Sequence, residues 1–146
     1  FCLRDSILSV LNAYRILTER EGYRFTLNCD PDVIVTGDEA RIKQVLSNLL
    51  NNAVRYGDEE KDITITVTKK DGVIRCEVTD RGQGIPEYEL EHIWERYYRS
   101  SDRRSRNTAG TGLGLAIVKE ILLLHKADFG VTSRLHAGST FWFELK

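Results

Sequence analysis

The chain has 146 residues, of which 41% are hydrophobic and 29% are charged, so it can bury one core and is too short for several domains. Its 21 basic and 22 acidic residues give a formal net charge of −1, which supplies no electrostatic reason to expect nucleic acid or an anionic membrane as the main partner. Three widely spaced cysteines without a CxxC pair argue against a disulfide framework or a zinc site, and they favour a reducing, cytoplasmic setting.

No apolar run approaches the roughly 20 residues that cross a bilayer, so we expect no direct membrane contact. The chain contains no Met and begins abruptly at Phe1. We therefore expect a monomeric fragment, residues 1–146 forming a single domain, excised from a longer protein.

Apolar residues recur at helical spacing in three stretches, and apolar and polar residues alternate in others, as in half-buried strands. In chain order, the expected elements are a helix over 5–20, strands over 23–29 and 33–36, a helix from Asp38 to Gly57, a hairpin over 63–67 and 74–78, a helix over 112–125, and strands over 129–134 and 140–145. The polar, basic residues 100–109 predict a mobile surface loop.

Three polar residues of the second helix, Asn48, Asn52 and Arg55, follow one another at i, i+4 and i+7 and share one stripe. Amide oxygens suit Mg²⁺, and a guanidinium suits phosphate oxygens. Solvated helix side chains are the usual explanation of such a trio, so both interpretations stay open.

Asp80 follows Ile74, Cys76 and Val78 in the alternation of the hairpin, so its carboxylate is predicted to face the buried side of the sheet. A buried carboxylate needs a donor, and the exocyclic amine of adenine is a suitable one. Gly82 and Gly84 would let the backbone approach the base. An isolated Asp-x-Gly-x-Gly is more often a turn that ends a strand.

A glycine-rich segment, Gly110-Thr111-Gly112-Leu113-Gly114-Leu115, opens the apolar helix, where free N–H groups can hold polyphosphate. It is neither a GxxxxGK nor a GxGxxG sequence. A helix-entry loop with packing glycines is the alternative.

These segments occur in the order of the motifs of one family. Residues 48–56 resemble its N box, residues 80–85 its G1 box, residues 110–115 its G2 box, and residues 138–140 a late G box. Residues 93–99 resemble its F box, although Trp94 and Tyr97 stand where Phe is more usual. The family is the ATP-binding catalytic domain of sensor histidine kinases, in the gyrase, chaperone, histidine kinase and MutL superfamily.

The resemblance implies an α/β (α+β) two-layer sandwich, in which about three main helices cover one face of a mixed, mostly antiparallel sheet. Residues of about 99–111 would form a mobile ATP lid. ATP and Mg²⁺ are implied as cofactors, with Asn52 as the Mg²⁺ ligand, Asn48 assisting it and Arg99 neutralising γ-phosphate charge. The implied ATP site comprises Asn48, Asn52, Arg55, Tyr56, Asp80, Gly82, Gly84, Ile85, Tyr98, Gly110, Thr111, Gly112, Leu113, Gly114, Leu115 and Thr140.

Hydrolysing relatives carry a catalytic Glu where this chain has Asn48, and an amide is a poor base near pH 7. Transfer of the γ-phosphoryl group to an external His therefore fits better than hydrolysis. His92, His125 and His136 lack the acidic neighbour of the family's phosphoacceptor motif. The implied acceptor is on an upstream helical dimerisation domain, with a response regulator as an indirect partner, and upstream segments could anchor the parent in the plasma membrane.

Two other functions stay open. One is a degenerate nucleotide-binding scaffold or regulatory module without phosphotransfer. It is suggested by two departures from the family pattern: Trp94 in the F box, and Lys126-Ala127 in place of the Gly-Gly that commonly follows His125. A serine-directed kinase or ATPase on the same fold is disfavoured by Asn48.

Overall fold

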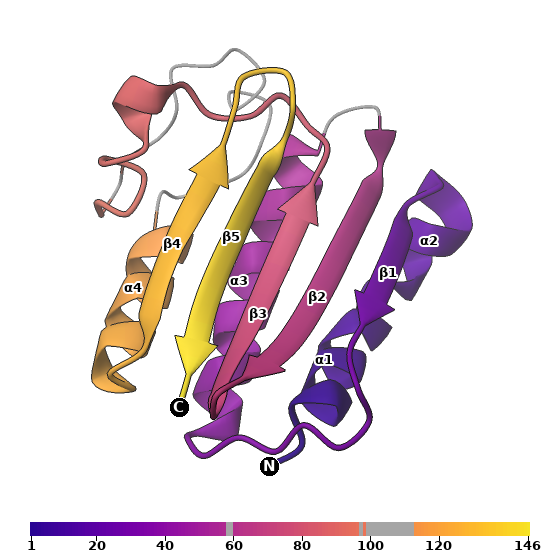
Figure 1. Cartoon of the computed structure of the whole chain (residues 1–146). Coiled ribbons are helices and arrows are strands. Elements are labelled where there is room, and N and C mark those ends of the chain that lie inside the picture. The colour runs from indigo at the N-terminus through magenta and orange to yellow at the C-terminus, as the bar shows by residue number, and fades with distance from the viewer. Residues whose placement is uncertain (58–59, 97, 99–112) are drawn as a thin grey trace.

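The computed structural model describes residues 1–57, 60–96, 98 and 113–146. Within these ranges the chain forms four α-helices, one short 3-10 helix and five strands (Figure 1). They are α1 (Leu3–Asn12), α2 (Arg15–Glu21), β1 (Arg24–Asn28), α3 (Glu39–Tyr56), β2 (Asp62–Lys70), β3 (Val73–Asp80), η2 (Glu87–Glu89), α4 (Gly114–Leu124), β4 (Asp128–Ser133) and β5 (Ser139–Leu145).

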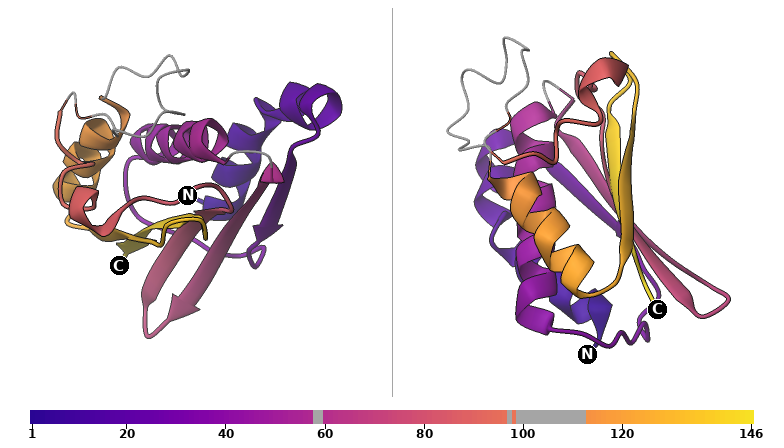
Figure 2. Two further views of the ribbon diagram at one scale, coloured as in Figure 1. Left: turned by 90° about the horizontal axis from the view of Figure 1, so that it is seen from above. Right: turned by 90° about the vertical axis from the view of Figure 1, so that its left-hand side faces the viewer.

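The five strands form one mixed sheet in the order β1-β2-β3-β5-β4. Only β1 and β2 run parallel, and the other three pairs are antiparallel. Figure 2 shows the helices in a layer on one face of the sheet. The predicted two-layer architecture is thus confirmed, as are the hairpin and both closing strands.

The core lies between the two layers. The apolar stripe of α3 supplies six buried residues, namely Ile42, Val45, Leu46, Leu49, Leu50 and Ala53. It faces alternate residues of β2, β3 and β5, of which Ile63, Ile65, Cys76 and Phe143 are fully buried. Burying each large side chain favours folding by about 1.5–3 kcal/mol, so this stripe fixes how α3 sits on the sheet.

The helix predicted over residues 5–20 is wrong in one respect, because α1 and α2 are separate helices. The break falls at Tyr14, whose backbone is not helical (φ −101°, ψ 8°). Its hydroxyl donates to the side-chain oxygen of Asn51 in α3 and lies 3.3 Å from the carbonyl oxygen of Ser47, and its ring lies 5.5 Å from that of Phe25. These tertiary contacts outweigh the helical spacing.

The predicted strand over residues 33–36 is also wrong, since these residues join no strand of the sheet. Their pairing is with the start of the chain, through a single bridge between Cys2 and Ile34. Leu3 N donates to Val33 O at 2.8 Å, and Val35 buries its side chain. Apolar alternation alone does not reveal which segment is the partner.

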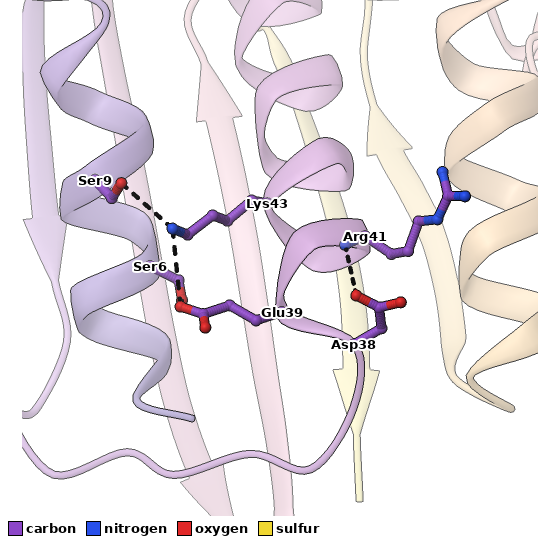
Figure 3. A network of polar contacts seen from close by, with 6 residues as sticks. All are labelled: Ser6, Ser9, Asp38, Glu39, Arg41 and Lys43. Atoms are coloured by element: carbon purple, nitrogen blue, oxygen red, sulfur yellow. Dashed lines mark hydrogen bonds and ion pairs between the residues drawn. The ribbon is translucent and has the colours of Figure 1, made fainter.

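The first turn of α3 is held at both sides by polar contacts (Figure 3). Asp38 caps the helix by accepting from Arg41 N at 3.2 Å. Toward α1, Ser6 donates to Glu39 at 2.9 Å, and Lys43 lies 3.8 Å from the same carboxylate. The cap satisfies an orphan N–H of the helix, and the other contacts fix α1 beside α3.

Within the described ranges, no helix is long and apolar enough to cross a membrane.

Candidate functional site

The polar stripe of α3 reaches the beginning of α4. Asn48, Asn52 and Arg55 are all half-buried. Asn48 Nδ2 donates to the carbonyl of Gly114 at 3.3 Å, so its amide links the middle of α3 to the first turn of α4. The structure therefore brings the predicted amide stripe and the end of the predicted glycine-rich segment together. No cluster of three or more His, Cys, Asp or Glu able to hold a metal occurs among the described residues.

Asn51, for which the sequence indicates no role, points to a different neighbour. Its side-chain oxygen accepts from the Tyr14 hydroxyl at 2.5 Å. Asn51 is exposed, whereas Asn52 is half-buried on the stripe. Two adjacent asparagines thus differ in environment, which makes them a matched pair for mutagenesis.

Asp80 ends β3 on the face that the helices cover, and it is only 3% exposed, as its alternation predicts. Its carboxylate accepts a 2.8 Å hydrogen bond from Gly82 N and a second from the backbone N–H of Ser139. Burial raises the pKa of Asp80 from 3.8 to about 6, and the two backbone donors lower it only in part. The result is a buried, oriented hydrogen-bond acceptor that is mostly ionised at pH 7.

At Gly82 and Gly84 there is no room for a side chain, because another part of the protein backbone lies too close. A Cβ at Gly82 would lie 1.8 Å from the carbonyl oxygen of Tyr56, the last residue of α3. A Cβ at Gly84, which has a φ of +78°, would lie 2.0 Å from Arg134 O. The predicted approach of a nucleotide base is a separate hypothesis, because close packing of the chain already explains both glycines.

Near Asp80 the structure places Ser139, which belongs to the predicted late G box, and Ser133, which sequence reasoning missed. Ser133 Oγ accepts from Ile85 N at 2.8 Å and lies 2.7 Å from Ser139 Oγ. Thr140, which the resemblance places in the site, has its hydroxyl 2.9 Å from that of Thr79, and its contact with nucleotide stays a prediction. Because side chains alternate along β5, the Thr140 side chain is on the face opposite Asp80, and Ser139 lies beside Asp80. The register of β3 with β5, which sequence patterns do not reveal, decides that Ser139 and not Thr140 lies beside Asp80.

The aromatic side chains of Trp94 and Tyr98 both have partners within the protein. Trp94 makes edge contacts with Phe129 and Phe141, with ring centroids 5.1 and 5.7 Å apart. The Tyr98 hydroxyl donates to the buried Glu89 carboxylate at 2.6 Å. Burial, followed by this bond, raises the Tyr98 pKa well above its usual value. A contact of Tyr98 with nucleotide stays a prediction.

The predicted phosphate-holding segment is described only from Leu113 onward. Leu113 is the N-cap of α4, and Leu115 is half-buried against the core. Among the described residues, nothing lies within 4 Å of a Cβ at Gly114, so their packing does not require this glycine. Tyr97, Arg99, Gly110, Thr111 and Gly112, and the expected lid over about 99–111, lie outside the described residues.

His125 joins the far end of α4 to the cap of α3. Its Nε2 accepts from Asp38 N at 3.1 Å, and its Nδ1 lies 2.9 Å from Ile121 O, an arrangement that requires the Nδ1–H tautomer. The next residue, Lys126, has a φ of +55°, a conformation that glycine adopts more easily. Lys126 thus adopts this conformation at a position where the family commonly has glycine.

Comparisons with known proteins agree with this architecture. Residues 37–146 match the family described as histidine kinase-, DNA gyrase B-, and HSP90-like ATPase. The chain belongs to this family. It is an ATP-binding catalytic domain of the histidine kinase type, because its similar proteins are sensor kinases. One is the sensor-like histidine kinase SenX3 of Mycolicibacterium smegmatis, 36% identical over 97% of this chain and 37% of that protein.

Other relatives support the same assignment. The phosphate regulon sensor protein PhoR of Pseudomonas aeruginosa is 38% identical over 94% of this chain and 31% of that protein. The solved catalytic domain of histidine kinase ThkA has a TM-score of 0.85 and 30% identity, over 99% of this chain and 92% of that one. The chain thus spans about a third of these two curated relatives but nearly all of a solved catalytic domain.

Proposed function

We propose that this chain binds Mg-ATP and donates the γ-phosphoryl group to a His on a separate helical domain of a two-component sensor kinase. The observation that carries the proposal is Asp80, a buried acceptor at the end of β3 held by two backbone N–H groups. Such a carboxylate can accept a further hydrogen bond from an exocyclic amine of a ligand. Adenine has this amine, whereas guanine has a carbonyl at the same ring position.

The polar stripe of α3 fits the phosphate end of the same ligand. Asn52 would supply an amide oxygen to Mg²⁺, and Arg55 would supply positive charge. The bond from Asn48 to Gly114 O keeps this stripe beside the first turn of α4, whose N-terminal N–H groups suit phosphate. Bound Mg²⁺ would neutralise phosphate charge as the leaving group departs.

Asn48 supports transfer rather than hydrolysis. An amide cannot take a proton from water near pH 7, and here its Nδ2 is engaged by the carbonyl of Gly114. Phosphoryl transfer needs mainly positioning and charge neutralisation, which Asn52, Arg55 and, by the family resemblance, Arg99 would provide.

None of the three histidines of this chain is followed directly by the acidic residue of the family's phosphoacceptor motif. Both ring nitrogens of His125 are engaged, and His92 Nδ1 lies 2.9 Å from Glu95. His136 lies at the tip of the β4–β5 turn with a φ of +66°. We therefore place the acceptor on a partner domain, whose parent would relay the phosphate to a response regulator, as sensor kinases do.

The test is transfer in trans. The purified chain is incubated with radiolabelled Mg-ATP and a separately purified helical domain that bears the acceptor His. We expect acid-labile, base-stable phosphate on that domain. Asn52→Ala should reduce transfer by about 100-fold or more, whereas Asn51→Ala should change it by less than about threefold.

The outcomes separate the alternatives. Nucleotide binding without transfer by the folded protein would favour a scaffold module and contradict the kinase proposal. Fast release of free phosphate would favour an ATPase. Equal effects of Asn52→Ala and Asn51→Ala on transfer would contradict the assignment of Asn52 as the Mg²⁺ ligand.

A further inference from the structure

The turn between β4 and β5 is built against the segment 80–85 that follows β3. Figure 1 shows both at the same end of the sheet. Their backbones touch at three points: a Cβ at Gly138 would lie 2.1 Å from Asp80 O, a Cβ at Gly84 would lie 2.0 Å from Arg134 O, and His136 N donates to Gln83 O at 2.6 Å. No side chain fits between them at these points.

Ser133, the last residue of β4, has a side chain that contacts both the turn and this segment. Its Oγ donates to Gly138 O at 3.0 Å, accepts from Ile85 N at 2.8 Å and lies 2.7 Å from Ser139 Oγ. A hydroxyl has one hydrogen and two lone pairs, so with Gly138 as its acceptor, Ser133 must accept from Ser139. The three bonds use its full hydrogen-bonding capacity.

Ser139 extends the connection to Asp80. It is 6% exposed and pairs with Asp80 in the β3–β5 register. Its backbone N–H donates to the Asp80 carboxylate while its hydroxyl binds Ser133. Ser133 thus acts on both ends of the segment, directly at Ile85 and through Ser139 at Asp80.

We propose that Ser133 is a positioning residue for recognition of the nucleotide base, holding Ile85 and, through Ser139, the Asp80 carboxylate in one geometry. The proposal rests on the nucleotide site described under the proposed function. Ser133 itself need not touch the ligand. A carboxylate held as an acceptor selects an amine over a carbonyl, so Ser133 would contribute to the preference for adenine over guanine.

The test compares ATP and GTP affinities of the wild type with those of Ser133→Ala, Ser133→Thr and the exposed strand neighbour Thr132→Ala. We expect Ser133→Ala to weaken ATP binding about five- to tenfold and to reduce the ATP-to-GTP preference by a similar factor. Ser133→Thr keeps the hydroxyl and should restore most of both, and Thr132→Ala should leave both unchanged. Equal weakening of both nucleotides would indicate mere loss of stability and overturn the proposal.

Amide hydrogen exchange of Ile85 supplies a readout that needs no nucleotide. In the wild type we expect this amide to exchange as slowly as those of β3, and in Ser133→Ala to exchange at least tenfold faster while the β3 amides change little. If Ser133→Ala does not fold, fast exchange of Ile85 in the wild type still refutes the proposal. If the folded wild type binds no nucleotide, the proposed function fails, and the exchange result still decides whether Ser133 holds the segment.

Discussion

Asp80 makes stability and nucleotide binding depend on pH in opposite ways. Its pKa is about 6 in the folded chain against an ordinary value of 3.8. Because folding raises this pKa, the favourable contribution of protonated Asp80 to stability is complete below pH 3.8 and is lost as the pH rises through 6. Between pH 4 and pH 7.5 the two pKa values give a loss of about 2.4 kcal/mol.

Asp80→Asn removes this titration. The introduced amide would have a fixed cost or gain of its own, such as a clash of its NH₂ with Ser139 N–H, but that term does not vary with pH. We therefore expect the free energy of unfolding of Asp80→Asn, relative to the wild type, to rise by about 2 kcal/mol from pH 4 to pH 7.5.

Urea denaturation of both proteins without nucleotide at the two pH values measures this change. Asp32→Asn, at an exposed turn, is the control and should show less than half of the effect. If the free energy of unfolding of Asp80→Asn, relative to the wild type, stays constant or falls as the pH rises, burial does not dominate the pKa of Asp80.

Two further predictions concern packing. Gly82→Ala forces a Cβ against the last carbonyl of α3 and should cost about 3 kcal/mol or more in stability. Gly114→Ala places its Cβ within 4 Å of none of the described residues and should leave stability unchanged. Similar denaturation midpoints for the two variants would contradict this contrast. His125→Ala removes the link between the α3 cap and the end of α4 and should cost about 1–3 kcal/mol in thermal unfolding. The exposed His92→Ala should leave stability unchanged, and a loss as large as that of His125→Ala would show a general effect of removing His.

Much of the architecture is predictable from this sequence because local pattern and tertiary structure agree. The stripe of α3 is apolar where it faces the sheet, and the alternation through Val78 places Asp80 on the buried face. The N-cap Asp38 and the following Gly57 bracket α3 as expected. In these stretches each residue type suits both its own element and its neighbours.

The misses share one cause, which is that partners distant in sequence decide them. Tyr14 breaks a helical pattern because Asn51 and Phe25 lie beside it in space. Ser133 looks like an ordinary strand-end serine until the β4–β5 turn is placed against Ile85.

Titration of the folded wild type and Asp80→Asn with Mg-ATP at pH 8, by calorimetry, tests the nucleotide site most directly. We expect saturable binding by the wild type and affinity reduced about 10- to 100-fold in Asp80→Asn, since a charge-assisted bond to the base would be lost. Equal affinities of the two folded proteins would contradict a site in which Asp80 recognises adenine.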